Sequence, residues 1–449
     1  PFFRLRWRKS RLPTNTVIAV PIITGLMGSE ECSDQTLTII GMQLVGFLAN
    51  RSFERAHALF SPEMKAAMTS HDLEAAWEGV TKQLGLPQGL TGSRLESEGN
   101  LNVVYVTTAF SSGSLLDVKV VFNESCEIAG LWFVPPKSEF EPPEYADCAA
   151  FEERDCAVGD CGLPGKMTIP KGEGLFPAVV LIHGSGPNDM DETLWETKVF
   201  RDLAWGLSSD GVAVLRYDKR PKARPDLFDS SIPFTVMDEV IYDALAGVEL
   251  LIRTEKVDSS KIFVLGHSLG GMMAPRIASL DNRIAGIIMM AGDAAKLEDA
   301  FLEQIEYLVN LDGVIDENEA SLLKETRETV TKIKELDISE GEVVLGAGKA
   351  YWEDLASYDH VKVASSLKMP ILVLQGKRDY QVTMEDFDLW KKALSGKAAK
   401  FISYPKLNHM MIEGEGPSTP SEYTLPGHLA QDVVEDIVDW IGNLFPNSV

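Results

Sequence analysis

The sequence predicts a mixed α/β fold in which a mainly parallel sheet is covered by helices on both faces. Strand and helix patterns alternate after residue 177, and a strand–turn–helix motif surrounds Ser268 within this alternation. A charged helical segment between residues 293 and 367 then interrupts the pattern. Alternation of this kind implies right-handed crossovers, and such sheets place functional residues at the carboxyl ends of their strands.

Length and composition set the frame for this prediction. The chain has 449 residues, enough for about two or three domains, and its 45% hydrophobic and 24% charged content is ordinary for a soluble globular protein. A formal net charge of −25 argues against a nucleic-acid partner, because phosphate binding needs clustered Lys and Arg.

The N-terminal segment, residues 1–34, allows two interpretations. Five basic residues precede an apolar run from 17 to 27, which is the order found in a secretory signal or anchor. The run is short for a bilayer span, contains Pro21 and Gly25, and lacks a clean cleavage site. The alternative is an ordered arm that packs on the body or on a partner subunit of a homo-oligomer. Export or membrane attachment is expected only if this arm is a signal, and a cytoplasmic location otherwise.

A small α+β domain is predicted from residue 35 to 137. Residues 36–60 and 62–84 have helical spacing, and residues 101–133 then alternate apolar and polar side chains across turns, as in an antiparallel meander. His57 and His71 have no ligand-forming neighbours at metal-site spacing, so solvated or packed histidines are expected.

Prolines near residues 135 and 143 mark a boundary, and residues 138–165 are expected to form a linker and entry strands. The predicted core consists of residues 166–292 and 368–449. Residues 293–367 are too many for a simple crossover, so we expect a helical cap. Three aromatic residues of its last part either line an apolar pocket or fasten the cap to the core: Tyr351, Trp352 and Tyr358.

The five cysteines are too few for a disulfide scaffold. Cys148, Cys156 and Cys161 lie close together without a nearby His, so a zinc site would lack its fourth ligand. A local disulfide and free thiols both remain open. We expect no metal site and no cofactor.

Ser268 is the predicted nucleophile. Apolar residues 262–265 suit a buried strand, Gly266 and Gly270 flank the serine in a sharp turn, and residues 272–280 can form the helix that follows. This arrangement exposes the hydroxyl and directs free helix N–H groups toward it.

A serine hydroxyl needs a base that takes its proton and a carboxylate that orients the base. His409 follows the last predicted strand and is our base, with His428 as the alternative; His183 and His267 lie in strand–turn motifs and are expected to shape loops. Asp379 follows a buried strand and a glycine turn and is favoured as the acid over Asp293.

The reaction also needs donors for a negatively charged oxygen. The turn His183–Gly184–Ser185–Gly186 ends an early strand, and we assign the oxyanion hole to the backbone N–H groups of Ser185 and Leu269. Residues 218–220 are expected to form an ion-paired loop with a structural role.

These residues resemble the α/β-hydrolase superfamily, which carries its triad in the order Ser, Asp, His. The stretch from Arg216 to Arg220 and the pair Asn408–His409 are similar to bacterial carboxylesterases with a small N-terminal domain of the nuclear-transport-factor-like type. One departure is Pro221, near which such relatives have a glycine. The resemblance implies an α/β-hydrolase core with an inserted helical cap and a smaller N-terminal α+β domain.

The resemblance also implies a function, namely a serine carboxylesterase that hydrolyses small, short-chain acyl esters through an acyl-enzyme intermediate. Two alternatives are a serine peptidase of the prolyl-oligopeptidase type, which shares the triad order, and a non-catalytic binding protein on a hydrolase scaffold. Acyl length, alcohol part and the role of the small domain are not predicted.

Overall fold

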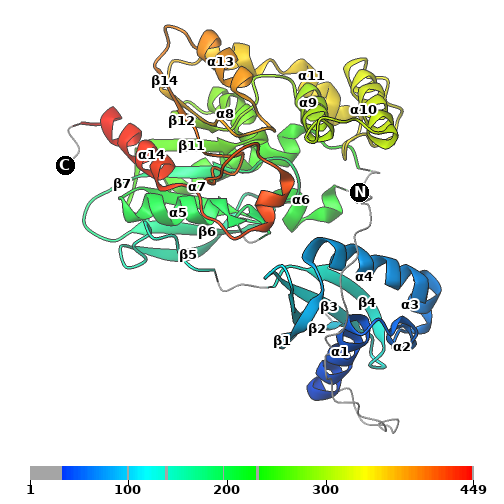
Figure 1. Ribbon diagram of the computed structural model, residues 1–449. Helices are drawn as coiled ribbons and strands as arrows, with labels where there is room; N and C mark the ends of the chain where they lie inside the picture. The colour runs from blue at the N-terminus through cyan, green and yellow to red at the C-terminus, as the bar shows by residue number, and fades with distance from the viewer. Residues whose placement is uncertain (1–32, 99–100, 137–139, 196, 229–231, 447–449) are drawn as a thin grey trace. The chain divides into compact units, whose positions relative to one another are not determined.

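The computed structural model describes residues 33–98, 101–136, 140–195, 197–228 and 232–446 (Figure 1). The chain divides into two compact units, residues 1–139 and 140–449, each of which is described by itself. Of the predicted N-terminal arm only Ser33 and Asp34 are described: Ser33 caps the first helix and Asp34 begins it, and residues 1–32 lie outside the described part.

The described part of the N-terminal unit contains four helices followed by an antiparallel sheet in the order β1-β2-β3-β4. Side-chain caps define the starts of three of these helices, as in the capping box between Thr69 and Asp72. The sequence predicted two long helices, but both are broken. The first breaks near Arg51, which adopts a positive φ of 55°, and the second breaks at Met68, which has an extended backbone. The elements are α1 (Asp34–Ala49), α2 (Phe53–Ala58), α3 (Pro62–Ala67), α4 (Ser70–Leu84), β1 (Pro87–Glu98), β2 (Leu101–Phe110), β3 (Leu115–Phe122) and β4 (Ile128–Val134).

This unit has a core of its own between the helices and the sheet. Leu44, Leu48 and Trp77 from the helices pack with Val104 and Val120 from the strands, and all are almost completely buried. Burial of one helix face and one sheet face is what stabilises an α+β layer.

The C-terminal unit is built on an eight-stranded sheet in the order β14-β13-β12-β11-β7-β10-β6-β5. All pairs from β14 to β10 are parallel, and β6 and β5 join antiparallel at the other edge. The predicted mainly parallel sheet is therefore confirmed. The strands are β5 (Phe151–Val158), β6 (Leu163–Pro170), β7 (Phe176–Ile182), β10 (Ala213–Tyr217), β11 (Val257–His267), β12 (Ile284–Met290), β13 (Ile371–Gly376) and β14 (Ala399–Tyr404).

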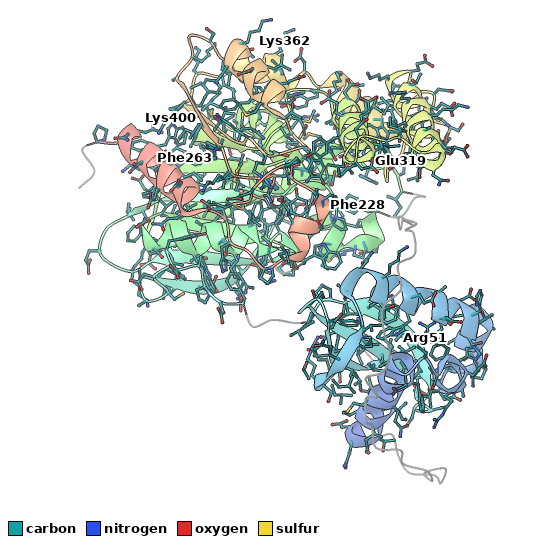
Figure 2. The ribbon with its side chains drawn as sticks, in the orientation of Figure 1. Arg51, Phe228, Phe263, Glu319, Lys362 and Lys400 are labelled. Atoms are coloured by element: carbon teal, nitrogen blue, oxygen red, sulfur yellow. The ribbon has the colours of Figure 1, made fainter. Side chains whose placement is uncertain are left out.

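Side chains of successive strand residues enter different cores on the two faces of this sheet. In β11, Val264 packs into the core under α7 and α8, whereas Phe263 packs into the core under α5 and α14, against Trp440 (Figures 1 and 2). Strands buried on both faces read as continuous apolar runs, which is why the sequence revealed them. The helices of this unit, apart from the cap, are α5 (Val199–Ser209), α6 (Arg220–Ala223), α7 (Tyr242–Ile252), α8 (Leu269–Leu280), α13 (Met384–Ala393) and α14 (Gln431–Leu444), with short 3₁₀ or π turns η1 (Pro225–Leu227), η2 (Met237–Ile241) and η3 (Pro420–Thr424).

The register of the parallel strands brings their carboxyl ends to one edge. Gly266 in β11 pairs with Ile182 at the end of β7, and His267 pairs with Met290 at the end of β12. Met290 pairs in turn with Leu374 of β13. The turns that follow β7, β11 and β13 therefore start side by side.

Helices α9 (Leu297–Val309), α10 (Glu317–Lys334), α11 (Lys349–Ser357) and α12 (His360–Ser366) occupy the segment that was expected to form the cap. Helices α9 and α10 form a hairpin with a small apolar cluster of Ile305, Val309 and Leu323 (Figure 1). Helices α11 and α12 pack on the main sheet core, which also includes Ile333 of α10.

The aromatic residues of α11 and its end fasten this segment to the core. Tyr351 and Trp352 belong to the main apolar cluster, and the indole of Trp352 donates to the carbonyl of Val344 at 3.1 Å. The Tyr358 hydroxyl donates to the carbonyl of Met272 in α8 at 3.3 Å. Of the two roles left open by the sequence, the fastening role is the one these contacts support.

The remaining features fit the sequence analysis. Cys148, Cys156 and Cys161 are free thiols. Pro221, at the departure from the family pattern, lies in the first turn of the short helix α6, where a missing N–H costs nothing. Within the described part of the chain, no helix combines the length and the apolar character that a membrane span requires.

Candidate active site

Ser268 lies on a tight turn between β11 and α8. Its backbone has φ of 54° and ψ of −120°, an uncommon conformation for a residue with a side chain. A Cβ atom on Gly266 would lie 2.0 Å from the carbonyl oxygen of Gly270, and one on Gly270 would lie 2.1 Å from the carbonyl oxygen of Ile182. Only glycine fits at both positions, so the two glycines allow the turn that leaves Ser268 half-exposed at the sheet edge.

His409 and Asp379 are brought together on neighbouring turns. Nδ1 of His409 lies 2.8 Å from Oδ2 of Asp379, and both side chains are almost completely buried. The other Asp379 oxygen accepts the backbone N–H groups of Gln381 and Val382 at 2.8 and 3.0 Å, and Gln375 donates to Oδ2 at 3.1 Å. Both carboxylate oxygens thus accept hydrogen bonds, which fixes the side chain in the orientation that a group holding an imidazole needs.

The turn of His409 also touches the serine turn. Nε2 of His267, the residue before Ser268, lies 3.0 Å from the carbonyl oxygen of His409, and the two rings are 4.7 Å apart. Within the described residues, neither the Ser268 hydroxyl nor Nε2 of His409 has a hydrogen-bond partner. Catalytic hydrogen bonds are often long without substrate, so this geometry leaves both groups available.

The two alternatives from the sequence, His428 for the base and Asp293 for the acid, are not part of the contact between His409 and Asp379. Nδ1 of His428 lies 3.2 Å from both carboxylate oxygens of Asp202 in α5, three residues before α14 rather than at its start. Asp293 is 2% exposed, and its Oδ1 has no hydrogen-bond partner among the described residues. Burial, together with the nearby carboxylates of Asp386 and Asp379, raises the pKa of Asp293 well above its usual range. Neither residue contacts the base chosen from the sequence.

The loop predicted to form the oxyanion hole packs against the nucleophile. A Cβ atom on Gly184 would lie only 3.1 Å from Cβ of Ser268, so Gly184 and Ser268 are in close contact. The backbone N–H groups of Ser185 and Leu269 have no acceptor within the described part of the protein. Two free N–H groups beside a nucleophile can bind a developing oxyanion.

A buried network behind the serine was not predicted from the sequence. Oε2 of Glu192 lies 3.0 Å from Nδ1 of His267, and its Oε1 accepts the N–H of Gly184 at 2.6 Å. Burial alone would lower the pKa of His267, but the Glu192 carboxylate raises it. Glu192 therefore joins the oxyanion loop to the turn of Ser268, and through His267 to the backbone of His409. The sequence signal was limited to the short acidic run that ends at Glu192.

Asn408 fixes the turn that carries the base. Its Oδ1 accepts the N–H groups of Met410 and Ile412 at 3.0 and 3.2 Å, and its Nδ2 donates to Glu422 at 3.1 Å. An Asn side chain that mimics a backbone turn in this way holds the residue after it in place. The Asn408–His409 pair, noticed only through the family resemblance, thus has a physical reason.

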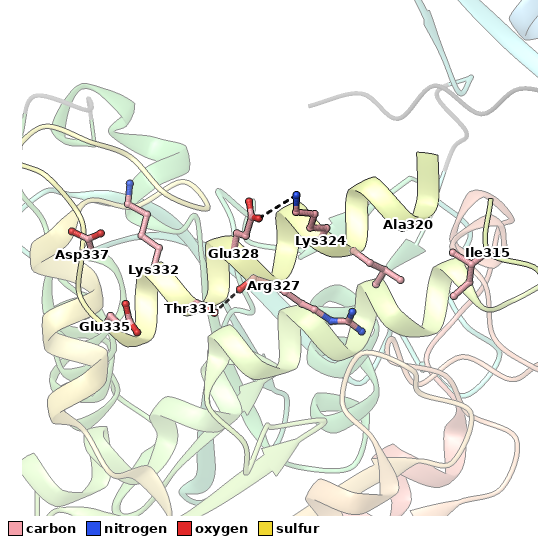
Figure 3. Close-up of a pocket in the computed structure, with 10 residues that line it drawn as sticks. Ile315, Ala320, Lys324, Arg327, Glu328, Thr331, Lys332, Glu335 and Asp337 are labelled. Atoms are coloured by element: carbon pink, nitrogen blue, oxygen red, sulfur yellow. Dashed lines mark hydrogen bonds and ion pairs between the residues drawn. The ribbon is translucent and has the colours of Figure 1, made fainter. Parts of the chain in front are cut away.

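A cavity of about 720 Å³ lies away from these residues, along one face of α10 (Figure 3). Charged side chains such as Lys324 and Glu328 line it, and these two form an ion pair at 3.8 Å. None of its lining residues belongs to the predicted triad. Among the described residues no group of His, Cys, Asp and Glu is arranged to hold a metal ion.

Comparison with known proteins supplies independent information. Residues 177–416 match the family model described as serine aminopeptidase, S33, and residues 42–131 match a family described as a protein of unknown function, DUF3887. Esterase EstD of Thermotoga maritima is 41% identical over 402 residues, which cover 88% of this chain and 93% of that protein.

The solved structures that are similar to this chain share little sequence identity with it. The esterase of the archaeon Pyrobaculum calidifontis is 17% identical, with 65% of this chain and 86% of that chain covered and a TM-score of 0.43. Est1E of Butyrivibrio proteoclasticus is 16% identical, with 65% and 97% covered and a TM-score of 0.41. A puromycin-hydrolysing peptidase of Mycobacterium tuberculosis is 15% identical, with 78% and 46% covered and a TM-score of 0.43.

Proposed function

This chain belongs to the α/β-hydrolase superfamily of serine hydrolases, and we propose that it hydrolyses short-chain acyl esters through an acyl-enzyme intermediate on Ser268. Carboxylesterase activity follows from the identity with Esterase EstD across nearly the whole of both chains. The proposal concerns the residues that carry the reaction and the size of the substrate.

In the proposed reaction, the Ser268 hydroxyl attacks the ester carbonyl carbon while Nε2 of His409 accepts its proton. Asp379 holds the imidazole through Nδ1 and stabilises its positive charge. The N–H groups of Ser185 and Leu269 bind the negatively charged oxygen, and His409 returns its proton to the departing alcohol. Water then attacks the acyl carbon while His409 accepts its proton. The bond to the Ser268 oxygen breaks, His409 returns the proton to that oxygen, and the acid is released.

One observation carries this assignment: the 2.8 Å contact between His409 and Asp379 on the edge of the sheet that also carries the serine turn. A nucleophile in a strained turn, an oriented imidazole and two free N–H groups are the parts that acyl transfer requires.

The test is a panel of p-nitrophenyl esters of increasing acyl length, with an organophosphonate probe to label the nucleophile. We expect the highest kcat/KM for esters with short acyl groups. Mass spectrometry should locate the bound phosphonate on Ser268. Ser268→Ala should lower kcat by at least about 10³-fold while the circular dichroism spectrum is unchanged. Turnover near the wild-type value in this variant would place the nucleophile elsewhere.

The family description names an aminopeptidase, so aminoacyl p-nitroanilides are the necessary comparison. We expect ester turnover to exceed anilide turnover by a wide margin. Anilide turnover well above ester turnover would instead establish a peptidase, and a protein that neither turns over substrate nor reacts with the phosphonate would be a binding protein.

A further inference from the structure

Lys219 is a buried charge that the proposed triad does not use. The residue is 2% exposed, and its ammonium group lies 2.6 Å from Oε1 of Glu239, itself 7% exposed, and 2.8 Å from the carbonyl oxygen of Gly184. Removing an ammonium group from water is costly unless its partners compensate. The sequence predicts only a structural role for this stretch.

The carbonyl that Lys219 holds belongs to the peptide unit that contains the N–H of Ser185. In a trans peptide the C=O and the N–H point in opposite directions, so fixing one fixes the other. Nδ2 of Asn188 donates to the same carbonyl at 3.2 Å. Two donors on one side of this peptide therefore keep the Ser185 N–H on the other side.

The peptide before it is fixed as well. The N–H of Gly184 donates to Glu192 at 2.6 Å, and Gly184 itself packs against Ser268. Glycine has little intrinsic preference for one backbone conformation, so without these contacts the loop would be free to rotate its peptides. An oxyanion hole works only when its N–H groups already point at the place where charge develops.

We propose that Lys219, neutralised by Glu239, is a positioning residue that holds the Gly184–Ser185 peptide with its N–H directed into the oxyanion hole. The inference rests on the proposed function, because it assigns a role toward the oxygen of an acyl-transfer intermediate. Lys219 touches neither substrate nor nucleophile and acts through the backbone of the loop.

Two variants of the full-length protein test the proposal. Lys219→Met removes the ammonium group but leaves the Glu239 carboxylate buried without its cationic partner, which by itself can unfold the protein. The double variant Lys219→Met/Glu239→Gln removes both charges and should remain folded, with a thermal midpoint near that of the wild type. Lys222→Met, on the same short helix but exposed, is the matched control.

With a short p-nitrophenyl ester, the double variant should lose about 10- to 100-fold in kcat, less than complete loss of an oxyanion donor, with KM changed by less than about threefold. The rate of phosphonate labelling should fall by a similar factor, since that reaction also develops charge on oxygen. The acid limb of the pH profile of kcat/KM should stay in place, because His409 and Asp379 are untouched.

A purely structural ion pair predicts the opposite, namely wild-type kcat in the folded double variant, and this result would overturn the proposal. An increase in KM with unchanged kcat would also overturn it, because it would assign Lys219 to substrate binding. If the wild-type protein neither turns over esters nor reacts with the phosphonate, the proposed function fails first and the role of Lys219 fails with it. If the wild type is labelled and the double variant is not, the proposed function stands and the role of Lys219 is supported.

Discussion

At the scale of single residues, Asp379 and Asp293 differ in the hydrogen bonds that their carboxylates make, and this difference separates a candidate catalytic acid from a buried carboxyl group. Both follow the end of a buried strand, and both were candidates from the sequence. Asp379 has hydrogen-bond donors on both oxygens and contacts His409, whereas Oδ1 of Asp293 has none among the described residues. The order of strands favoured Asp379 in advance, but the hydrogen-bond donors that occupy its two oxygens come from the folded turns.

The first prediction concerns this acid. Asp379→Asn keeps the shape of the side chain but removes the charge that stabilises the imidazolium, so kcat should fall by about 10³- to 10⁴-fold. Steady-state kinetics with a short p-nitrophenyl ester measures the loss. Activity within tenfold of the wild type would show that another carboxylate orients His409.

The second prediction uses Asp293 as the matched control. Its pKa is raised by burial, so at neutral pH the folded state must either hold a charge in an apolar site or take up a proton. The stability associated with this group is therefore present at low pH and lost as the pH rises through its folded-state pKa. Asp293→Asn should keep kcat within about twofold and raise the thermal midpoint at about pH 7. A fall in kcat comparable to that of Asp379→Asn would contradict the assignment.

The third prediction concerns the contribution of His183 to the pH dependence of the free energy of unfolding. Burial lowers the pKa of His183 from its ordinary value of 6.5 to about 4. The unfolded chain therefore binds a proton that the folded protein does not, and stability is lost as the pH falls from about 6.5 toward 4. Gln does not titrate, so the His183→Gln variant lacks this loss of stability. When the pH is lowered from about 7 to 4, its free energy of unfolding should rise relative to that of the wild type on the order of 3 kcal/mol. Urea unfolding at both pH values measures the difference, and a difference independent of pH would contradict a neutral His183.

Glu192 and Lys219 mark the limit of reasoning from sequence at this scale. Glu192 meets His267, and Lys219 meets the Gly184 carbonyl, across long separations in the chain. A lone Glu or Lys in a loop carries no periodicity and no motif of its own. Only the folded turns show that both charges are buried and that both hold the same loop.

At the scale of elements, the parallel strands were predictable because burial on both faces makes them apolar throughout. The strand expected at residues 284–290 is β12, and that expected at 371–374 extends only two residues further in β13. The strand β1 was missed, since Gly89 and Gly92 and many polar residues obscure any alternation, and its pairing with β2 contains two register shifts. Such a strand is recognised by its partner rather than by its own side chains.

The fourth prediction tests the contact between α8 and the end of β7. Gly270→Ala would place a methyl group 2.1 Å from the carbonyl oxygen of Ile182, so the serine turn must move. We expect a loss of about 3 kcal/mol or more in the free energy of unfolding and a strong loss of activity. Denaturant unfolding and esterase assays measure the two effects.

Gly442→Ala in α14 is the control for this variant. A Cβ atom there meets nothing within 4 Å, and alanine favours a helix over glycine. This variant should gain about 0.5–1 kcal/mol and keep full activity. Equal effects of the two substitutions would show that the contact at Gly270 is not as tight as the structure has it.

At the scale of the whole molecule, the apolar cores of each unit are built, among the described residues, from side chains of that unit. The core of the N-terminal unit draws on residues 37–133, and both cores of the C-terminal unit draw on residues after 145. The residues of the proposed triad and both proposed oxyanion donors lie in the C-terminal unit. The sequence predicted the separation from the proline-rich boundary, but it gave no role for the smaller unit.

The fifth prediction follows from this division. Residues 140–449 expressed alone should fold, with a single cooperative transition in denaturant, and should hydrolyse a short p-nitrophenyl ester with kcat within a few-fold of the full chain. Circular dichroism and steady-state kinetics are the measurements. A folded fragment with a hundredfold lower kcat would mean that the N-terminal unit supplies part of the site.

The α9–α10 hairpin has a consequence for engineering. Its apolar cluster of Ile305, Val309 and Leu323 comes from its own two helices, but the hairpin is also anchored outside itself. Ile333 of α10 belongs to the main sheet core, and the ring of Tyr307 in α9 stacks on Tyr380 with 4.9 Å between the ring centroids. A library that varies or grafts this hairpin therefore has to keep these two anchoring residues if the engineered protein is to keep its fold.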